Sequence, residues 1–126
     1  MQHEPEIIIL LIDDELVCNG LTLLLEDMSF HVISACTYLE LQQLLKESIT
    51  TPSLFISNNE QTAAEIVQGI RKKFNGVIPA ILFYTDTPTD INLITDSALA
   101  LLPAQIKPKD LRQKINEMTQ PIKINN

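Results

Sequence analysis

Two carboxylates and one amide are the candidate side chains for metal binding or nucleophilic chemistry in this chain. Asp13 and Asp14 follow an apolar run over residues 7–12, and Asn58 follows a shorter apolar run that ends at Ser57. Mg²⁺ accepts carboxylate oxygens as ligands. The Asn58 amide carries no negative charge and is a far poorer nucleophile than a carboxylate. These residues predict weak Mg²⁺ binding at Asp13 and Asp14 at most, and no catalytic residue.

Each of these side chains also has a purely structural interpretation. Asp13 and Asp14 precede a segment of helical pattern, and acidic residues at the start of a helix interact favourably with its dipole. Asn58 either hydrogen-bonds one of the two aspartates or lies in a solvated loop. The sequence leaves both choices open.

The composition describes one small globular domain. The chain has 126 residues, of which 45% are hydrophobic and 20% charged, and its net charge is −7. Such an acidic domain lacks the basic footprint of direct nucleic-acid binding. No apolar run approaches the roughly 18 residues of a membrane span. We expect a cytoplasmic protein in which Cys18 and Cys36 are reduced core thiols, with a disulfide as the alternative.

Strand-like and helix-like segments alternate along the whole chain. Strands are predicted over residues 7–12, 31–35, 54–57, 78–84 and 98–102. Helices are predicted over about 15–28, 37–48, 62–74, 90–96 and 108–118. Alternation with short connections predicts an α/β fold of the doubly wound, flavodoxin-like (βα)5 type, with a five-stranded parallel sheet of order 2-1-3-4-5 and helices on both faces. The domain is expected to span residues 1–119, and residues 120–126 a flexible tail or the start of a linker.

The first predicted helix has an inward stripe at helical spacing. Its members are Val17, Leu21, Leu24, Leu25 and Met28. The carboxyl ends of the first and third strands lie side by side in this strand order. Asp13, Asp14 and Asn58 should therefore meet at one edge of the sheet.

Two segments resemble a known family. The run Ile-Leu-Leu-Ile-Asp-Asp-Glu over residues 9–15 is its most specific part, and residues 101–111 are similar to the passage from the fifth strand into the last helix. Over residues 7–118 the chain resembles the receiver domains of response regulators in two-component signal transduction. This resemblance implies a Mg²⁺ site of paired acids, an aspartate that accepts a phosphoryl group, a Ser or Thr after the fourth strand and a Lys after the fifth.

The resemblance places several unusual residues at those positions. Asp13 and Asp14 match the paired acids, but Asn58 stands at the phosphoacceptor position. The hydroxyl position falls on Tyr84, with Thr85 one residue away. The resemblance thus implies an atypical phosphoacceptor site.

The segment after the fifth strand departs from the family further. The lysine position falls on Ala104, and Gln105 stands where the family has a cis-proline. The aromatic switch position, three residues earlier, is Leu101. Lys107 and Pro108 match a separate Lys-Pro at the start of the last helix. So many joint losses favour natural degeneration of the site.

The expected function is that of a non-enzymatic pseudo-receiver, a protein–protein interaction module that works without phosphorylation. Its partner would be a histidine kinase, a fused output domain or a second copy, with no nucleic acid or membrane. The expected contact surface comprises Asp90, Asn92, Leu93, Leu99, Leu101, Lys109 and Gln113. The alternative is a switchable regulator that responds to a ligand or to phosphorylation at a non-standard residue such as Asp13 or Asp14. An unrelated flavodoxin-like enzyme is disfavoured because Gly20, Gly69 and Gly76 are isolated and form no phosphate-binding loop.

Overall fold

The computed structural model describes residues 6–47, 51–58, 63–84 and 99–119, and the side chains of residues 63 and 64 are not described. Strands and helices alternate in the order β1 (Ile7–Leu11), α1 (Glu15–Asp27), β2 (His31–Ala35), α2 (Tyr38–Lys46), β3 (Leu54–Ser57), α3 (Ala63–Phe74), β4 (Ala80–Tyr84), β5 (Leu99–Pro103) and α4 (Pro108–Thr119). The helix predicted over residues 90–96 lies outside the described residues.

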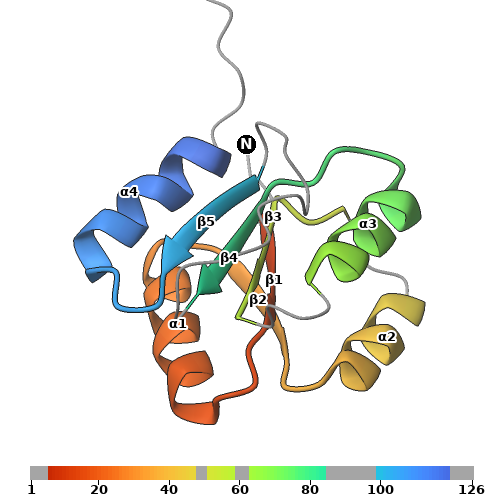
Figure 1. Ribbon diagram of the computed structural model, residues 1–126, viewed down its shortest axis with the longest axis horizontal. Coiled ribbons are helices and arrows are strands. Elements are labelled where there is room, and N and C mark those ends of the chain that lie inside the picture. The colour runs from red at the N-terminus through yellow and green to blue at the C-terminus, as the bar shows by residue number, and fades with distance from the viewer. Residues whose placement is uncertain (1–5, 48–50, 59–62, 85–98, 120–126) are drawn as a thin grey trace, which may run out of the picture.

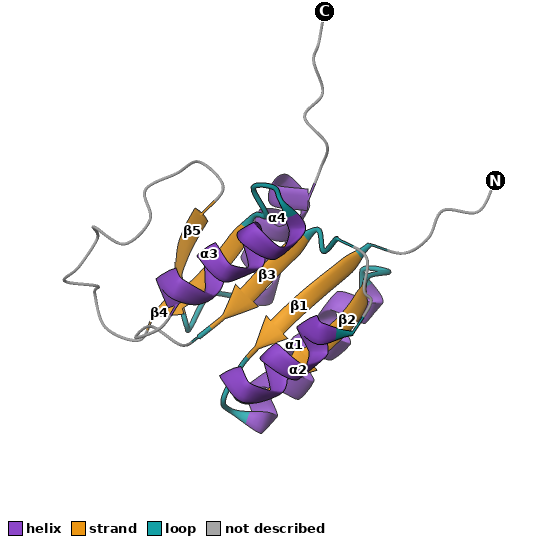
Figure 2. Cartoon of the chain, turned by 90° about the vertical axis from the view of Figure 1, so that its right-hand side faces the viewer, coloured by secondary structure: helices purple, strands orange, loops and turns teal. Residues whose placement is uncertain are grey.

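The five strands form one parallel sheet of order β2-β1-β3-β4-β5. This confirms the predicted flavodoxin-like strand order. Helices α1 and α4 lie on one side of the sheet, and α2 and α3 lie on the other (Figure 1; Figure 2). Four of the five residues of β1 are buried, as expected of a central strand that is covered on both faces.

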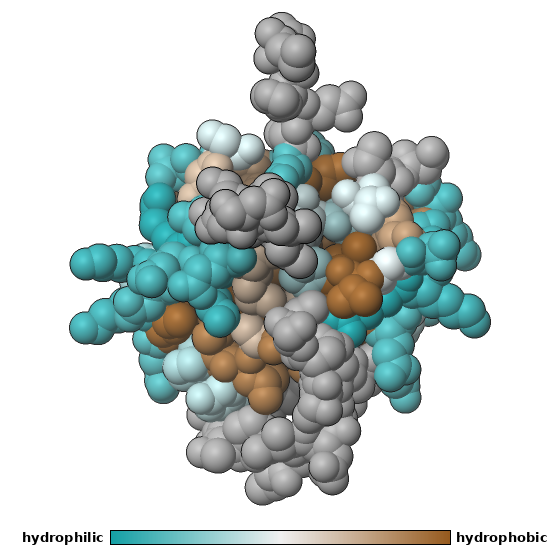
Figure 3. Space-filling model, turned by 90° about the horizontal axis from the view of Figure 1, so that it is seen from above, coloured by the Kyte–Doolittle hydropathy of each residue, from teal (hydrophilic) through white to brown (hydrophobic). Residues whose placement is uncertain are grey.

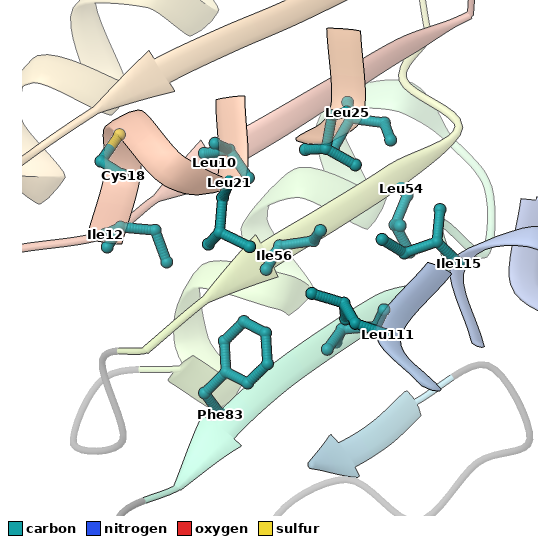
Figure 4. Packing of buried hydrophobic residues seen from close by; sticks show 12 residues of the cluster. Leu10, Ile12, Cys18, Leu21, Leu25, Leu54, Ile56, Phe83, Leu111 and Ile115 are labelled. Carbon is teal, nitrogen blue, oxygen red and sulfur yellow. The ribbon is translucent and has the colours of Figure 1, made fainter. Parts of the chain in front are cut away.

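Alternate residues of the strands supply two separate cores. The core under α1 and α4 joins even-numbered β1 residues to Cys18, Leu21 and Leu25 of α1 and to Leu111 and Ile115 of α4 (Figure 4). The other core joins the odd-numbered β1 residues to side chains of α2 and α3, namely Leu41, Ile66, Val67 and Ile70. Because successive side chains of a strand point to opposite faces, each face of the sheet packs against its own layer of helices.

The inward stripe of α1 differs from the predicted one. Cys18, Leu21 and Leu25 are buried, whereas Val17 is 46% exposed. Leu24 and Met28 pack against the core only in part. The prediction for Val17 was wrong because α1 carries apolar residues on more than one side, so more than one stripe fits the period of 3.6.

The boundaries of the last two strands shift by one or two residues for a backbone reason. β4 begins at Ala80 rather than at residue 78, because Pro79 has no N–H to donate to the ladder. The carbonyl of Pro79 still accepts from the N–H of Phe55 at 2.9 Å. β5 ends at Pro103, a residue type that an edge strand tolerates.

Both cysteines are free thiols in the structure. Cys18 is a core residue, but Cys36 is exposed, and the prediction of a core position for it was wrong. No helix among the described residues is long and apolar enough to cross a membrane.

Large hydrophobic side chains also reach the surface at the edge where the strands begin. Figure 3 looks onto this edge and shows hydrophobic side chains in separate patches among polar ones. Val77, just before β4, is 70% exposed. Single exposed apolar residues of this kind are normal on soluble domains.

Candidate functional site

The candidate site lies at the carboxyl edge of the sheet, where β1 and β3 end side by side. Leu11 and Ser57 are the last paired residues of these two strands. The N–H of Asn58 then reaches the carbonyl oxygen of Leu11 at 3.4 Å. The pairing therefore extends one step past β3 and brings Asn58 next to the segment that carries Asp13 and Asp14.

Asn58 contacts Asp13 through both ends of its side-chain amide. Its Nδ2 donates to Oδ1 of Asp13 at 2.9 Å, and its Oδ1 accepts from the backbone N–H of Asp13 at 3.2 Å. Of the two alternatives that the sequence left open, the hydrogen-bonded one is confirmed. A carboxylate at position 58 has no hydrogen to donate and would place a second negative charge against Asp13.

Asp14 serves the first helix. It is the N-cap residue of α1, and its Oδ1 accepts from the N–H of Leu16 at 2.9 Å and from the N–H of Val17 at 3.3 Å. These contacts satisfy backbone donors that have no partner within the helix. The structural interpretation, with Asp14 at the start of the first helix, is confirmed for Asp14, whereas Asp13 pairs with Asn58 instead.

This arrangement fits Mg²⁺ poorly. One oxygen of each aspartate already accepts hydrogen bonds, and Asn58 presents its N–H₂ group rather than an oxygen to the carboxylate of Asp13. Among the described residues no three His, Cys, Asp or Glu side chains gather as a potential metal-binding group. Mg²⁺ is bound through oxygen ligands, usually with at least one carboxylate. The donor set therefore lacks the third oxygen ligand that a carboxylate at position 58 would supply.

At the other side of the edge, β4 and β5 end together. Tyr84 pairs with Pro103, and the N–H of Ala104 donates to the carbonyl oxygen of Tyr84 at 2.9 Å. Ala104 is thus the residue directly beyond β5, and its methyl group carries no charge. The chain then turns, with the N–H of Ile106 bonded to the carbonyl oxygen of Pro103 at 3.1 Å. Thr85, the alternative to Tyr84, lies outside the described residues.

Lys107 belongs to the beginning of α4 rather than to the end of β5. Its carbonyl oxygen accepts from the N–H of Leu111 at 2.9 Å, and Pro108 is the first residue of the helix. Proline suits this position because its missing N–H is not needed in the first turn. The sequence-based separation of Lys107 from the position of Ala104 agrees with this geometry.

The expected contact surface is described in part. Leu99 is half-buried against the core under α2 and α3, and Leu101 is 39% exposed at the edge strand. Lys109 and Gln113 are exposed on α4, where they line a shallow hollow with Arg112, Asn116 and Glu117. Asp90, Asn92 and Leu93 lie outside the described residues.

An exposed thiol at the same edge, that of Cys36, was not predicted from the sequence. Cys36 follows β2, whose last residue Ala35 is paired with Leu11. The pKa of the Cys36 thiol is raised, mainly by partial desolvation and next by the negative charge of Glu40. Cys18 and Glu15 have smaller effects. The signal in the sequence was its place directly after the second predicted strand, at the edge that carries the aspartates.

Comparison with other proteins supports the fold of this chain and not a particular function. No model of a protein family matches the chain, and no curated protein matches it. Solved structures of response-regulator receivers do match, although their sequences are only distantly similar.

Three of these structures illustrate the likeness. A receiver domain protein from Clostridium thermocellum has a TM-score of 0.74 at 17% identity, covering 90% of this chain and 94% of that one. A receiver protein from Sinorhizobium medicae WSM419 has a TM-score of 0.78 at 12% identity, with 92% and 95% covered. An orphan response regulator of H. pylori has a TM-score of 0.73 at 12% identity, with 91% and 97% covered. The chain is similar to receiver domains in fold over nearly its whole length.

Proposed function

We propose that this chain is a pseudo-receiver, a non-enzymatic interaction module of two-component signalling that works without phosphorylation. The observation that carries the proposal is the double contact between Asn58 and Asp13 at the carboxyl edge of a receiver-like sheet. It occupies the place where the family resemblance expects a phosphoacceptor aspartate. The neutral amide stabilises this edge without any ligand.

Phosphoryl transfer depends on positioning and on neutralising charge. The nucleophile would have to be a carboxylate, and Asn58 is an amide. The cation expected after β5 is replaced by Ala104, whose backbone is bonded to Tyr84. Two of the parts that hold a phosphoryl group are thus missing from this edge.

The proposed contact surface follows β5 and α4. Leu101 presents an apolar side chain at the edge strand, and Lys109 and Gln113 line the hollow on α4. Leu101 lies on the same side of β5 as Leu99, and Lys109 and Gln113 lie on α4, so the proposed surface spans the β5 edge of the sheet. The proposed partner is a histidine kinase, a fused output domain or a second copy of the chain.

A switchable regulator is the second candidate. It is favoured by the exposure of Asp13 and Asp14, which leaves both carboxylates within reach of a phosphodonor. In that case one of them would carry the phosphoryl group in place of residue 58.

Intact-mass spectrometry after incubation with acetyl phosphate and Mg²⁺ separates the two candidates. We expect an unchanged mass, because an amide forms no acyl phosphate. The Asn58→Asp variant should be phosphorylated slowly and in low yield, since Ala104 leaves the phosphoryl charge uncompensated. A gain of one phosphoryl group in the unsubstituted chain would favour the switchable regulator.

Beryllofluoride provides an independent test, because it mimics a phosphoryl group on an aspartate. We expect it to leave the amide NMR signals of Asp13, Asn58, Leu101 and Ala104 unchanged and to leave self-association unchanged. Widespread shifts at stoichiometric beryllofluoride would contradict the pseudo-receiver proposal.

A further inference from the structure

Helix α1 carries a second apolar face that points away from the core. Leu16 is 83% exposed and Leu23 is 69% exposed. At about 100° per residue, Leu16, Gly20 and Leu23 lie within roughly 60° of one another on the helix. They lie opposite the buried stripe of Cys18, Leu21 and Leu25. We call Leu16, Gly20 and Leu23 the outer face of α1.

Scattered exposed leucines need no explanation, but two leucines on one helix face with glycine between them form a pattern. An amphipathic surface helix normally presents charged and polar residues on the side away from the core. A surface helix that also carries large apolar residues on its outer side is typical of a position that is partly covered there. The outer face of α1 therefore has the character of a contact surface.

Gly20 adds an independent observation. A Cβ atom at this position would meet nothing within 4 Å, and no described glycine has a positive φ. Neither packing within the domain nor backbone conformation thus requires glycine here, although glycine in the middle of a helix is unfavourable. A glycine between two leucines lets the backbone of another helix approach closely.

The charge around the outer face selects the partner. Helix α1 contains Glu15, Glu26 and Asp27 and no basic residue. Arg112 of α4 pairs with Asp27 at 2.8 Å. Glu26 also lies in the last turn of α1, where a negative charge opposes the helix dipole. Two copies of a chain of net charge −7, joined through this face, would bring these acids together. A basic partner would be attracted to them.

We propose that the outer face of α1 docks an amphipathic helix of another protein, whose apolar stripe covers Leu16 and Leu23 and whose lysine or arginine side chains flank it. This surface is separate from the one along β5 and α4, and the proposal does not depend on that one. It gives the module a second site for a protein partner.

The test uses a fluorescent synthetic helix with a leucine stripe and lysine flanks, together with a counterpart in which every lysine is glutamate. Anisotropy titration should show binding of the lysine helix, and amide NMR should place the largest shifts between Leu16 and Leu23. The glutamate helix should bind at least about tenfold more weakly, which corresponds to about 1.4 kcal/mol. Absence of binding, shifts centred elsewhere or equal binding of both helices would overturn the proposal.

Matched variants locate the contact. Leu16→Gln and Leu23→Gln remove apolar surface without adding charge, and each should weaken binding of the lysine helix about tenfold. Leu39→Gln is the control, because Leu39 on α2 is 68% exposed, nearly the same as Leu23. If Leu39→Gln weakens binding as much as Leu23→Gln does, the contact is non-specific and the proposal fails. All three positions are exposed, and circular dichroism should show that the variants remain folded.

Sedimentation velocity tests the competing occupant, a second copy of the chain. We expect an oligomeric state and a sedimentation coefficient that Leu23→Gln leaves unchanged. Concentration-dependent dimers that disappear in Leu23→Gln but persist in Leu39→Gln would show that the outer face serves self-association, and would overturn the proposal of a basic partner.

Discussion

The side-chain amide of Asn58 joins the ends of β1 and β3 by hydrogen-bonding two different atoms of Asp13. One contact uses the amide as a donor and the other uses it as an acceptor. A carboxylate at position 58 could reproduce only the second. The residue that stands where the family resemblance expects a phosphoacceptor aspartate is therefore also one that stabilises the edge.

The Asn58→Asp variant should be less stable than the unsubstituted chain by about 1–2 kcal/mol at neutral pH, because one hydrogen bond is lost and two carboxylates face each other. Urea unfolding measures the difference. Protonation of the two carboxyl groups at low pH removes their mutual repulsion, so the deficit should be smaller at low pH than at neutral pH.

Two controls belong to this experiment. Asn58→Ala removes the amide without adding charge, so its deficit should not share the pH dependence of Asn58→Asp. The double variant Asp13→Asn with Asn58→Asp restores one amide and one carboxylate, and should recover part of the stability. A single variant Asn58→Asp that is as stable as the unsubstituted chain at pH 7 would contradict the role assigned to the amide.

The cap at Asp14 gives a second prediction. Asp14→Ala should lower the free energy of unfolding by about 1 kcal/mol, because the N–H groups of Leu16 and Val17 lose their acceptor. Asp14→Asn should have a much smaller effect, since asparagine is also a favourable N-cap residue. Thermal or urea unfolding of both variants distinguishes capping from a charge effect. Equal losses in the two variants would show that the negative charge, rather than the cap, is what matters.

Magnesium should stabilise the domain little. A ligand present at its own Kd stabilises by only about 0.4 kcal/mol, which raises the Tm of a domain of this size by roughly 3 °C or less. Differential scanning fluorimetry with millimolar Mg²⁺ measures this shift, with Asp13→Asn as the control. A rise of many degrees that Asp13→Asn abolishes would show that the two aspartates form a working metal site.

The strand order could be predicted because strict alternation of strands and helices is typical of a doubly wound parallel sheet, whose common five-stranded order is 2-1-3-4-5. β1 is apolar without interruption, and such a strand belongs in the middle of a parallel sheet. That order alone places Asp13, Asp14 and Asn58 at one edge. The N-cap of α2 can also be read from the sequence, since Thr37 and Glu40 have the spacing of a capping box. In the structure the Thr37 hydroxyl accepts from the N–H of Glu40 at 3.1 Å.

What the sequence could not decide depends on contacts between distant segments. Whether Asn58 meets Asp13 or water is a matter of a few ångströms between two loops. The inward face of α1 was assigned to Val17 because its leucines fit two stripes, and only packing against α4 and the sheet selects Cys18. Leu16 and Leu23 are exposed because they lie on the side of α1 opposite the buried stripe of Cys18, Leu21 and Leu25.

Cys36 yields a prediction about thiol reactivity. Because its pKa is raised, the thiolate fraction at neutral pH is smaller than in an ordinary exposed cysteine, and alkylation by iodoacetamide should be slow. The rate should increase with pH to a midpoint above that of a model thiol. Glu40→Gln removes the largest nearby negative charge and should lower this midpoint. An unchanged midpoint in Glu40→Gln would show that the charge of Glu40 does not contribute to the raised pKa of Cys36. Cys18, which is buried, should react only after unfolding.

Gly20 offers a prediction that links stability to contact with a partner. Gly20→Ala should raise the free energy of unfolding by about 0.5–1 kcal/mol, because alanine favours the helix and its Cβ meets nothing within 4 Å. Gly69→Ala in α3 is the matched control, since its Cβ also meets nothing within 4 Å. Urea unfolding should show a gain for both variants. If a partner helix approaches α1 closely, only Gly20→Ala should weaken binding of the lysine helix, so that the more stable protein binds less well. Equal binding by the two glycine variants would show that the helix backbones do not approach each other at Gly20.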